Sequence, residues 1–383
     1  MSDGVKTVAL ELQPCCGQRS GIGIYTYELA KRLQSNENIH FCGNIFNFCG
    51  RNDNSVSLKG IGMPLNESRI FPYGIYRRIW NLLPISYEYF FPTQADLTIF
   101  FNYIVPPRVH GKVITTIYDM TYLRFPETMN SRNLRRLKEG MQRSMARSDR
   151  ILTISSFSKQ EIIDLLHVPD EKISVIPCAP SFSNDLVDFN ILKQKFGLNK
   201  PYLLYVGTIE PRKNLVRLIQ AYEQLKRKED FPYQLVLAGG KGWQNQEIYQ
   251  TANTSTFRDD IIFTGYISDA EKNCLYENAA LFVFPSIYEG FGMPPLEAMH
   301  WGCPVVSSTA ASLPEVVGDA AELVDPLSVG SITSGIQKVI SNKSYADTLR
   351  SRGSRQVTRY TWDLSADLLY KSCLEALGAT TLF

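Results

Sequence analysis

Short, continuously apolar segments alternate with helix-like segments along almost the whole chain. Residues 7–12, 96–101 and 112–118 are apolar at mostly consecutive positions, and residues 22–33 have the pattern of a helix. Strands that are apolar throughout are buried on both faces, and a helix between two strands carries the chain to a parallel neighbour. The alternation therefore predicts an α/β fold, with helices on both faces of a parallel sheet.

The same alternation starts again near residue 200. A Pro/Ser-rich stretch at 177–184 separates the two series and is suited to a linker. We therefore expect two Rossmann-like, doubly wound domains, covering residues 1–184 and 185–359. Ligands of such sheets bind at the carboxyl ends of the strands, so a cleft between the domains is the expected site. The strands expected in the second series are residues 202–206, 234–238, 261–263, 281–284 and 304–306.

Three helix starts have recognisable caps. Ser158 is followed three residues later by a glutamate, which is the pattern of a capping box. Asn214 is placed to cap a helix over 214–228. Pro294 or Pro295 suits the first turn of a helix, where a missing N–H costs nothing.

Charge and hydropathy exclude several classes of protein. The chain has 40 Lys and Arg against 38 Asp and Glu, whereas a dedicated nucleic-acid-binding protein is far more basic. No apolar run approaches the ~18 residues of a membrane span, and the first residues lack a signal-peptide apolar region. We therefore expect a cytoplasmic protein. The charge is uneven, because residues 1–180 contain 21 basic and 16 acidic side chains and the remainder contains 19 and 22.

Cysteine and histidine spacing gives no indication of a metal site. The eight cysteines form no Cys-x-x-Cys pair, and the four histidines do not lie near them at zinc-ligand spacing. We expect reduced thiols that serve as small apolar side chains, and no metal or cofactor.

Two segments of the second series carry groups suited to an anionic sugar derivative. In Gly207-Thr-Ile-Glu-Pro-Arg-Lys-Asn214, Arg212 and Lys213 precede a helix and suit a diphosphate, although a solvated charged loop is the alternative. In residues 285–299, Gly and Pro surround Glu289 and Glu297, and carboxylates accept well from sugar hydroxyls. Surface carboxylates beside a capped helix are the alternative there.

Two segments of the first series also follow predicted strands. In Ser20-Gly-Ile-Gly-Ile-Tyr25, Gly21 and Gly23 either let a phosphate or sugar approach the backbone or simply form a tight turn. This is no dinucleotide fingerprint, because Thr26 occupies the third glycine position. Asp119, after Tyr118 at the end of an apolar strand, either accepts from a hydroxyl or holds a backbone turn.

These segments together resemble retaining glycosyltransferase family 4, whose members have the GT-B fold. The run from Glu289 to Met299 is similar to the family's motif of two glutamates separated by seven residues, and Glu-Pro-Arg-Lys-Asn214 is similar to a second motif. The resemblance extends to the glycine loop, to residues 154–159 and to residues 313–320. It implies two Rossmann-like domains facing across a cleft, with a C-terminal helix at 360–383 that crosses back to the first, acceptor-binding domain.

The resemblance also implies roles for residues of the second, donor-binding domain. Arg212 and Lys213 would hold the diphosphate of a nucleotide-sugar donor, and Glu289 would contact the transferred sugar. Glu297 would hold the ribose. The loop Gly265-Tyr266-Ile267 would lie near the base. The backbone expected to hold sugar hydroxyls is that of Gly290, Phe291 and Gly292.

In the first domain the resemblance includes the glycine loop and departs from the family at one position. Gly21 and Gly23 would let the donor diphosphate and the acceptor come close. Many members have His-Asp where this chain has Tyr118 and Asp119, so the catalytic set expected here contains a phenol in place of an imidazole. A phenol donates a hydrogen bond but is no general base near neutral pH, because its reference pKa is ~10.

The expected function is that of a retaining glycosyltransferase that moves a hexose, with GDP-mannose as the first candidate donor, in bacterial O-antigen or related surface polysaccharide synthesis. A UDP-sugar or dTDP-rhamnose donor, or a non-catalytic nucleotide-sugar-binding protein, is the alternative. Family members are thought to react by front-face attack without a side-chain nucleophile. The chain contains no Asp-x-Asp, which agrees with a metal-independent donor site.

The expected acceptor is a polyprenyl-diphosphate-linked glycan at the cytoplasmic face of an anionic inner membrane. Residues 69–91 contain eight aromatic side chains and three arginines, and residues 132–150 contain seven basic side chains against two acidic. Basic and aromatic segments favour membrane interfaces. An ordinary aromatic core beside a locally basic helix is the alternative.

Overall fold

The computed structural model describes residues 5–17, 20–50, 57–82, 85–180, 185, 187–228 and 231–378. The chain divides into two compact units. The first unit consists of Met1–Tyr122, Ser131–Cys178 and Thr361–Phe383, and the second of Leu123–Asn130 and Ala179–Tyr360. Half of the predicted linker at 177–184, namely residues 181–184, lies outside the described residues.

The first unit is built on a seven-stranded sheet in which every described pairing is parallel. Its strand order is β3-β2-β1-β4-β5-β6-β7. The elements, in sequence order, are β1 (Lys6–Glu11), η1 (Gln13–Cys15), α1 (Gly21–Arg32), β2 (Ile39–Phe46), η2 (Phe48–Gly50), β3 (Leu65–Ser68), α2 (Tyr73–Ile79), η3 (Tyr87–Phe90), β4 (Leu97–Phe100), β5 (Lys112–Thr116), α3 (Thr121–Arg124, at the boundary), α4 (Ser131–Arg147), β6 (Arg150–Thr153), α5 (Ser156–Leu166), η5 (Asp170–Lys172), β7 (Ile173–Val175) and α14 (Trp362–Leu377).

The second unit is built on a six-stranded sheet, again parallel in every described pairing. Its strand order is β10-β9-β8-β11-β12-β13. The elements are η4 (Pro126–Thr128), α6 (Phe189–Phe196), β8 (Tyr202–Val206), η6 (Pro211–Lys213), α7 (Leu215–Lys226), β9 (Gln234–Ala238), α8 (Gln246–Thr254), η7 (Arg258–Asp260), β10 (Ile261–Gly265), α9 (Asp269–Asn278), β11 (Leu281–Phe284), α10 (Met293–His300), β12 (Val305–Ser308), α11 (Leu313–Val317), β13 (Glu322–Val324), α12 (Val329–Ser341) and α13 (Lys343–Val357).

Both sheets have the topology of doubly wound α/β folds, so the predicted fold class is confirmed. Numbered within its own unit, each sheet begins with the order 3-2-1-4-5-6. The direction of winding reverses between the first and fourth strands, which are β1 and β4 in one unit and β8 and β11 in the other. Loops that leave the carboxyl ends of these two strands diverge, and ligands of such sheets bind there.

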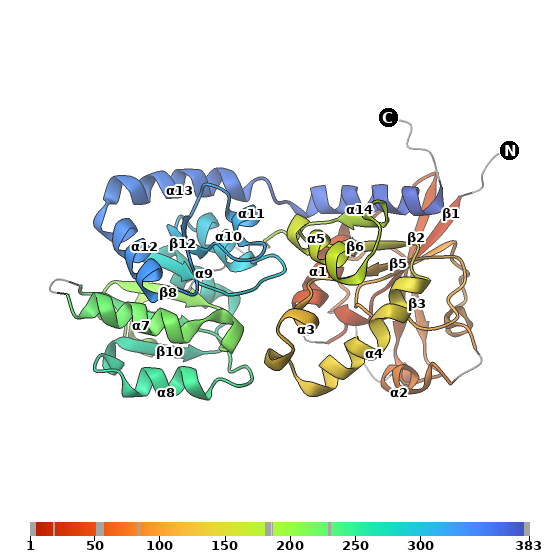
Figure 1. The fold of residues 1–383 in the computed structure, drawn as a ribbon. Coiled ribbons are helices and arrows are strands. Elements are labelled where there is room, and N and C mark those ends of the chain that lie inside the picture. Colours follow the sequence, from red (N-terminus) through yellow and green to blue (C-terminus); the bar gives the residue numbers. More distant parts are fainter. Residues whose placement is uncertain are drawn as a thin grey trace. The chain divides into compact units, whose positions relative to one another are not determined.

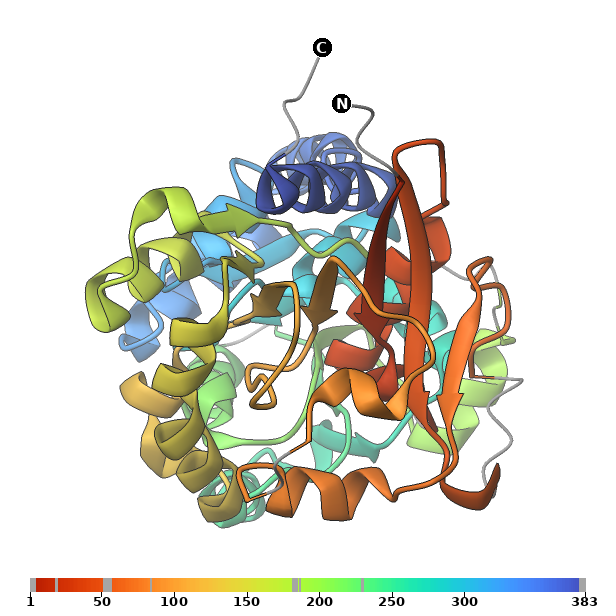
Figure 2. The same ribbon diagram turned by 90° about the vertical axis from the view of Figure 1, so that its right-hand side faces the viewer.

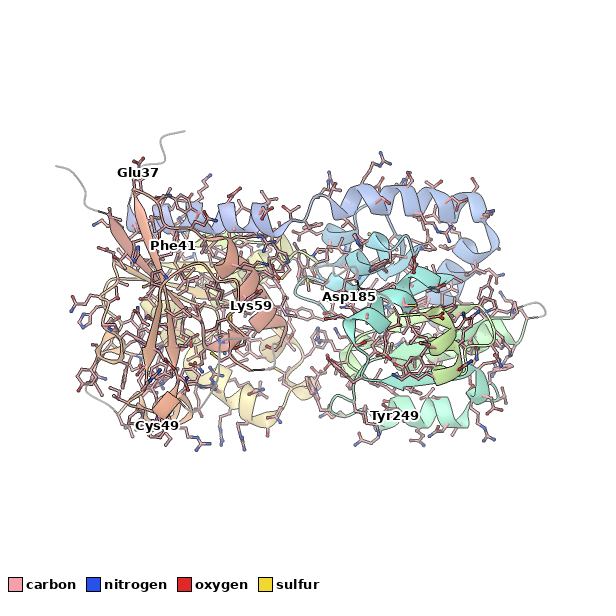
Figure 3. All side chains as sticks on the ribbon, turned by 180° about the vertical axis from the view of Figure 1, so that it is seen from behind. Glu37, Phe41, Cys49, Lys59, Asp185 and Tyr249 are labelled. Carbon is pink, nitrogen blue, oxygen red and sulfur yellow. The ribbon has the colours of Figure 1, made fainter. Side chains whose placement is uncertain are left out.

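The last helix belongs to the first unit, as predicted. α14 packs against α1, β4 and β5 and lies over the sheet (Figure 1 and Figure 2). Trp362 at its start has its ring 5.8 Å from that of Tyr25 on α1. Farther along the helix, the ring of Tyr370 lies 6.2 Å from that of Phe41 on β2, which is labelled in Figure 3.

An aromatic cluster fills the core of the first unit beside β2. The ring of Phe46 is its centre, and neighbouring rings lie between 5.1 and 6.3 Å away. These neighbours are Tyr73, Tyr76, Tyr87, Phe90 and Phe91. Most of the aromatic residues in the 69–91 segment therefore pack in the core. For those side chains the structure favours the ordinary aromatic core, which was the alternative to a membrane role.

The predicted helix cap at Ser158 is wrong, and the reason is local. Ser155, not Ser158, is the cap of α5, because its hydroxyl accepts from the backbone N–H of Ser158 at 3.0 Å. The hydroxyl of Ser158 is buried and lies 3.1 Å from the carbonyl of Tyr118. Across the described residues, no helix is long and apolar enough to cross a membrane.

Candidate active site

The carboxyl ends of β8 and β11 bring together two loops that are distant in sequence. The chain leaving β8 forms η6, which contains Arg212 and Lys213. The chain leaving β11 contains Glu289 before α10 begins. Since β8 and β11 are paired in parallel at the reversal of the sheet, these side chains meet at the edge where ligands of such folds bind.

Two cations contact the Glu289 carboxylate. Lys213 Nζ lies 2.5 Å from Oε1, and Arg212 Nη1 lies 3.0 Å from Oε2. Arg212 also donates to the Tyr288 carbonyl at 2.6 Å and to Glu210 at 2.9 Å. Lys213, Glu210 and Glu289 are each less than a tenth exposed. The cluster is thus a buried ion-pair network, and the solvated-loop and surface-carboxylate alternatives are wrong.

The network fixes the ionisation of Glu289. Burial by itself would raise the pKa of this carboxyl, but the charges of Lys213 and Arg212 and the hydrogen bond from Lys213 lower it to about 2. Glu289 is therefore a carboxylate at neutral pH. Among the described residues, Glu289 is the one hydrogen-bond acceptor within reach of the Lys213 ammonium, which has three hydrogens to donate.

Asn214 links the two loops, which corrects its predicted role. The residue precedes α7, but it has a left-handed backbone (φ 62°) and its side chain makes no cap hydrogen bond. Its amide instead donates to the carbonyls of Pro285, at 3.0 Å, and Pro326, at 2.6 Å. In addition, the backbone N–H of Ile287 donates to the carbonyl of Arg212. The cation loop is therefore held directly to the loop that carries Glu289.

The turn after Glu289 needs glycine at position 292. Gly292 has φ 101°, a left-handed conformation, and a Cβ there would meet Leu313 Cδ2 at 2.4 Å. Ser312, which sequence reasoning missed, lies under the turn with its hydroxyl 2.9 Å from the Glu289 carbonyl and 2.8 Å from the Phe291 carbonyl. Its place directly before residues 313–320, which resemble the family, is the signal that could have identified it.

Glu297 forms a second polar cluster on α10. Its carboxylate accepts from Lys272 Nζ at 3.3 Å and from the hydroxyl of Tyr276 at 3.1 Å. Both partners lie on α9, and neither was predicted. Glu297 adds a carboxylate that vicinal hydroxyls of a sugar could reach, since its side chain remains 13% exposed.

The loop predicted to lie near the base contains two contrasting side chains. Tyr266 is 78% exposed, whereas Ile267 is buried. Both follow β10, at the carboxyl edge of the same sheet. An exposed ring at this edge can stack on a flat ligand.

The remaining predicted residues belong to the first unit. Gly21 is the first residue of α1, and Ser20 caps this helix by accepting from the N–H of Gly23 at 3.5 Å. The Asp119 carboxylate accepts from the N–H of Thr121 at 2.9 Å, so it holds a backbone turn. The Tyr118 hydroxyl donates to the Phe101 carbonyl at 2.9 Å, and burial raises its pKa well above the ordinary value.

The described side chains form no group of three or more His, Cys, Asp or Glu that could hold a metal ion. None of the eight cysteines, all of which lie among the described residues, takes part in a disulfide, and burial raises the pKa of the Cys303 thiol to about 12. The candidate site instead offers a guanidinium, an ammonium and two carboxylates at a sheet edge. This set can neutralise a diphosphate and accept from sugar hydroxyls.

Two family models match the chain. Residues 188–356 match "Glycosyl transferases group 1", and residues 19–179 match "Glycosyltransferase Family 4". Together they cover every strand of the two sheets except β1.

Curated and solved relatives point the same way. The chain is 32% identical over 364 residues to the O-antigen chain mannosyltransferase B of Escherichia coli, covering 90% of this chain and 93% of that protein. The sucrose-phosphate synthase of Thermosynechococcus elongatus has a similar fold, with a TM-score of 0.71, 17% identity and coverage of 98% and 100% of the two chains. The structure of Anabaena Alr3699/HepE in complex with UDP-glucose is also similar in fold. Its TM-score is 0.70 at 18% identity, and the match covers 97% of this chain and 100% of that chain.

The two family models and the extent of the match to the E. coli protein establish the family. The chain is a glycosyltransferase of family 4 with two Rossmann-like domains, and it is similar to the O-antigen mannosyltransferases.

Proposed function

We propose that this glycosyltransferase transfers mannose from GDP-mannose, with retention of anomeric configuration, to a lipid-linked glycan acceptor in bacterial O-antigen synthesis. The observation that carries the proposal is the buried network of Arg212, Lys213 and Glu289 where the donor-side sheet reverses. The similarity to an O-antigen mannosyltransferase supports mannose as the sugar.

The network suits the main electrostatic problem of this reaction. Cleaving the sugar–phosphate bond leaves negative charge on a nucleoside diphosphate, and preorganised cations stabilise that charge as it develops. Arg212 offers a planar fork and Lys213 a compact charge, and both are held in place before the donor binds. In the proposal Glu289 also lies beside the transferred sugar.

The rest of the donor is assigned by position. Glu297 accepts from the ribose hydroxyls, Tyr266 and Ile267 lie beside the base, and the backbone of Gly290, Phe291 and Gly292 lies beside the sugar hydroxyls. Tyr118 and Asp119 stay predictions for the catalytic set, and Gly21 and Gly23 stay predictions for the close approach of the donor diphosphate and the acceptor. The high pKa of Tyr118 supports a hydrogen-bonding role, because a phenol that keeps its proton is no base.

A panel of nucleotide sugars tests the donor. We expect release of free sugar or transfer from GDP-mannose at a rate at least tenfold above that from UDP-glucose or dTDP-rhamnose, and the product anomer, read by NMR, should match the donor. Because Arg212 and Lys213 supply the positive charge, treatment with EDTA should leave the rate within twofold. A preference for a UDP-sugar would replace the assigned donor, and binding without turnover of any donor would indicate a nucleotide-sugar-binding protein.

The lipid-linked acceptor implies contact with a membrane, for which we propose the α2 segment of the first unit. Ile75 is 47% exposed and Leu82 is 82% exposed. They stand in a short segment with Arg77 and Arg78, and basic helices with exposed apolar side chains bind anionic interfaces.

Flotation with phosphatidylglycerol vesicles tests this contact. The protein should float at low salt, and the double variant I75S/L82S should bind about tenfold more weakly, since it removes two apolar side chains from the interface. Leu327, which is 61% exposed in the second unit, gives the matched control L327S. Equal binding by all three proteins, or no binding by the wild type, would contradict the proposal.

A further inference from the structure

Arginines crowd around one concave pocket of the first unit. The pocket has a volume of about 540 Å³ and lies between α2 and α4. Seven of its fourteen lining residues are arginines, against one acidic residue, Glu139. A volume of this size is in the range of small-molecule sites.

The sequence places these arginines on one face of α4. The arginines of α4 that line the pocket are Arg132, Arg135, Arg136, Arg143 and Arg147. Four of them, at 132, 136, 143 and 147, follow one another at spacings of four, seven and four residues, which keeps them on one side of the helix, and Arg135 flanks Arg136. The buried residues of the helix are Leu137, Met141 and Ser144, so its other face packs inward. Arg77 and Arg78 of α2 complete the lining.

The seven arginines of this pocket face few carboxylates among the described residues. Glu139 is part of the lining, and the charges of Arg77 and Arg136 also act on the buried carboxyl of Glu11, whose pKa burial raises to about 7. In the part of the chain that is described, Arg77, Arg135, Arg136 and Arg143 form no ion pair with a carboxylate, whereas Arg32, Arg150 and Arg212 elsewhere do. Burial and the charge of Arg77 lower the pKa of Arg136. Cations that are crowded and partly buried in this way are stabilised by an anion that accepts from several of them at once.

The surroundings of the arginines indicate what carries the anion. Trp80, Ile104 and Val105 also line the pocket, so its wall is partly apolar. Exposed apolar side chains continue along α2 and beyond it at Ile75 and Leu82. A phosphate group attached to an apolar chain fits this combination better than a free, fully hydrated anion.

From this arrangement we infer that the arginine-lined pocket between α2 and α4 binds the diphosphate group of the lipid-linked acceptor. This inference rests on the proposed function for the identity of the acceptor. A diphosphate has enough oxygen atoms to accept from several guanidinium forks together. The remaining volume leaves room for an attached sugar.

Inorganic pyrophosphate is the direct probe of the pocket. Calorimetric titration of the full chain should give binding that is at least tenfold weaker in R135Q/R143Q, two exposed positions whose replacement should leave the fold intact. A second pair, R136Q/R147Q, tests the half-buried arginines, and G74L adds bulk at a lining position where a Cβ meets open space.

Two controls separate the pocket from other sources of binding. K59Q/K138Q removes the same charge from two exposed positions outside the lining and should weaken binding less than twofold. Lys138 lies on α4 itself, and Lys59, which is labelled in Figure 3, lies in a loop. R212A removes a cation from the donor site. If K59Q/K138Q weakens binding as much as R135Q/R143Q, or if R212A abolishes it while the pocket variants keep it, the inference is overturned.

Vesicles distinguish a lipid-linked diphosphate from other anions. The wild-type protein should bind neutral phosphatidylcholine vesicles that carry a polyprenyl diphosphate. The R135Q/R143Q variant should bind the same vesicles at least tenfold more weakly. If the pocket variants lose affinity only for phosphatidylglycerol vesicles, the pocket is a membrane surface and the inference is wrong.

The two proposals fail separately. Pyrophosphate binding needs no donor and no transfer, so pocket-dependent binding without any transfer activity would support the pocket and count against the proposed function. If the protein transfers sugar but its affinity for pyrophosphate is unchanged by every pocket variant, the proposed function is supported and the inference about the pocket is contradicted.

Discussion

Replacing Arg212 by alanine is expected to lower the rate of sugar transfer by about 10²–10³-fold, the usual loss when one preorganised donor to a developing negative charge is removed. The fold should survive, because Lys213 still pairs with Glu289 after the change. Steady-state kinetics with a saturating donor checks the prediction. Arg212→Lys should recover part of the rate, since an ammonium restores the charge but not the planar fork.

A matched control lies in the same unit. Arg227→Ala removes the same charge from an exposed side chain whose nearest carboxylate, that of Glu223, is 3.9 Å away, and it should leave the rate within twofold. Full activity in Arg212→Ala would remove this residue from the proposed diphosphate site. Lys213 is the less informative test, because deleting a buried cation destabilises the carboxylate it pairs with.

Replacing Glu289 by glutamine is expected to lower both stability and activity. The pKa of this carboxyl is about 2 in the folded protein against an ordinary 4.5, so its ionised form stabilises the fold by about 3 kcal/mol at neutral pH. That contribution is fully present above pH 4.5 and is lost as the pH falls toward 2. Urea unfolding should therefore show a difference between wild type and Glu289→Gln that is constant from pH 7 to pH 5 and about 1 kcal/mol smaller at pH 3.5.

Transfer by Glu289→Gln should fall by about 10²-fold, because the two cations lose the group that holds them in place. Glu277→Gln, at an exposed position on α9, is the control and should change neither the transfer rate nor the free energy of unfolding. A stability difference that stays constant down to pH 3.5 would show that the cations do not keep this carboxyl ionised.

The strands of the second sheet could be predicted from sequence because burial on both faces leaves a continuous apolar run. The predicted strands 202–206, 234–238 and 281–284 agree with β8, β9 and β11. β3 was not predicted, because it is an edge strand with the sequence Leu-Asn-Glu-Ser and lacks such a run. Edge strands face solvent on one side and need less apolar surface.

The candidate site could be predicted in part, and the contacts that were not predicted have one feature in common. Arg212, Lys213 and Glu289 were identified, and the parallel order explains why they meet. The sequence did not reveal that the Asn214 amide bonds two carbonyls of other loops, or that Ser312 holds the turn after Glu289. These contacts join residues far apart along the chain, so no local pattern reports them.

The place of α14 has a consequence for the order in which the two units are completed. Arg32 and Arg150 of the first unit form ion pairs with Asp363 and Glu375 of α14, and Ser365 donates to the carbonyl of Pro177. On a ribosome, which makes the chain from its amino end, every residue of the second unit precedes this helix. The strands of the first unit are therefore synthesised before those of the second, but the first unit is complete only after α14 has been synthesised.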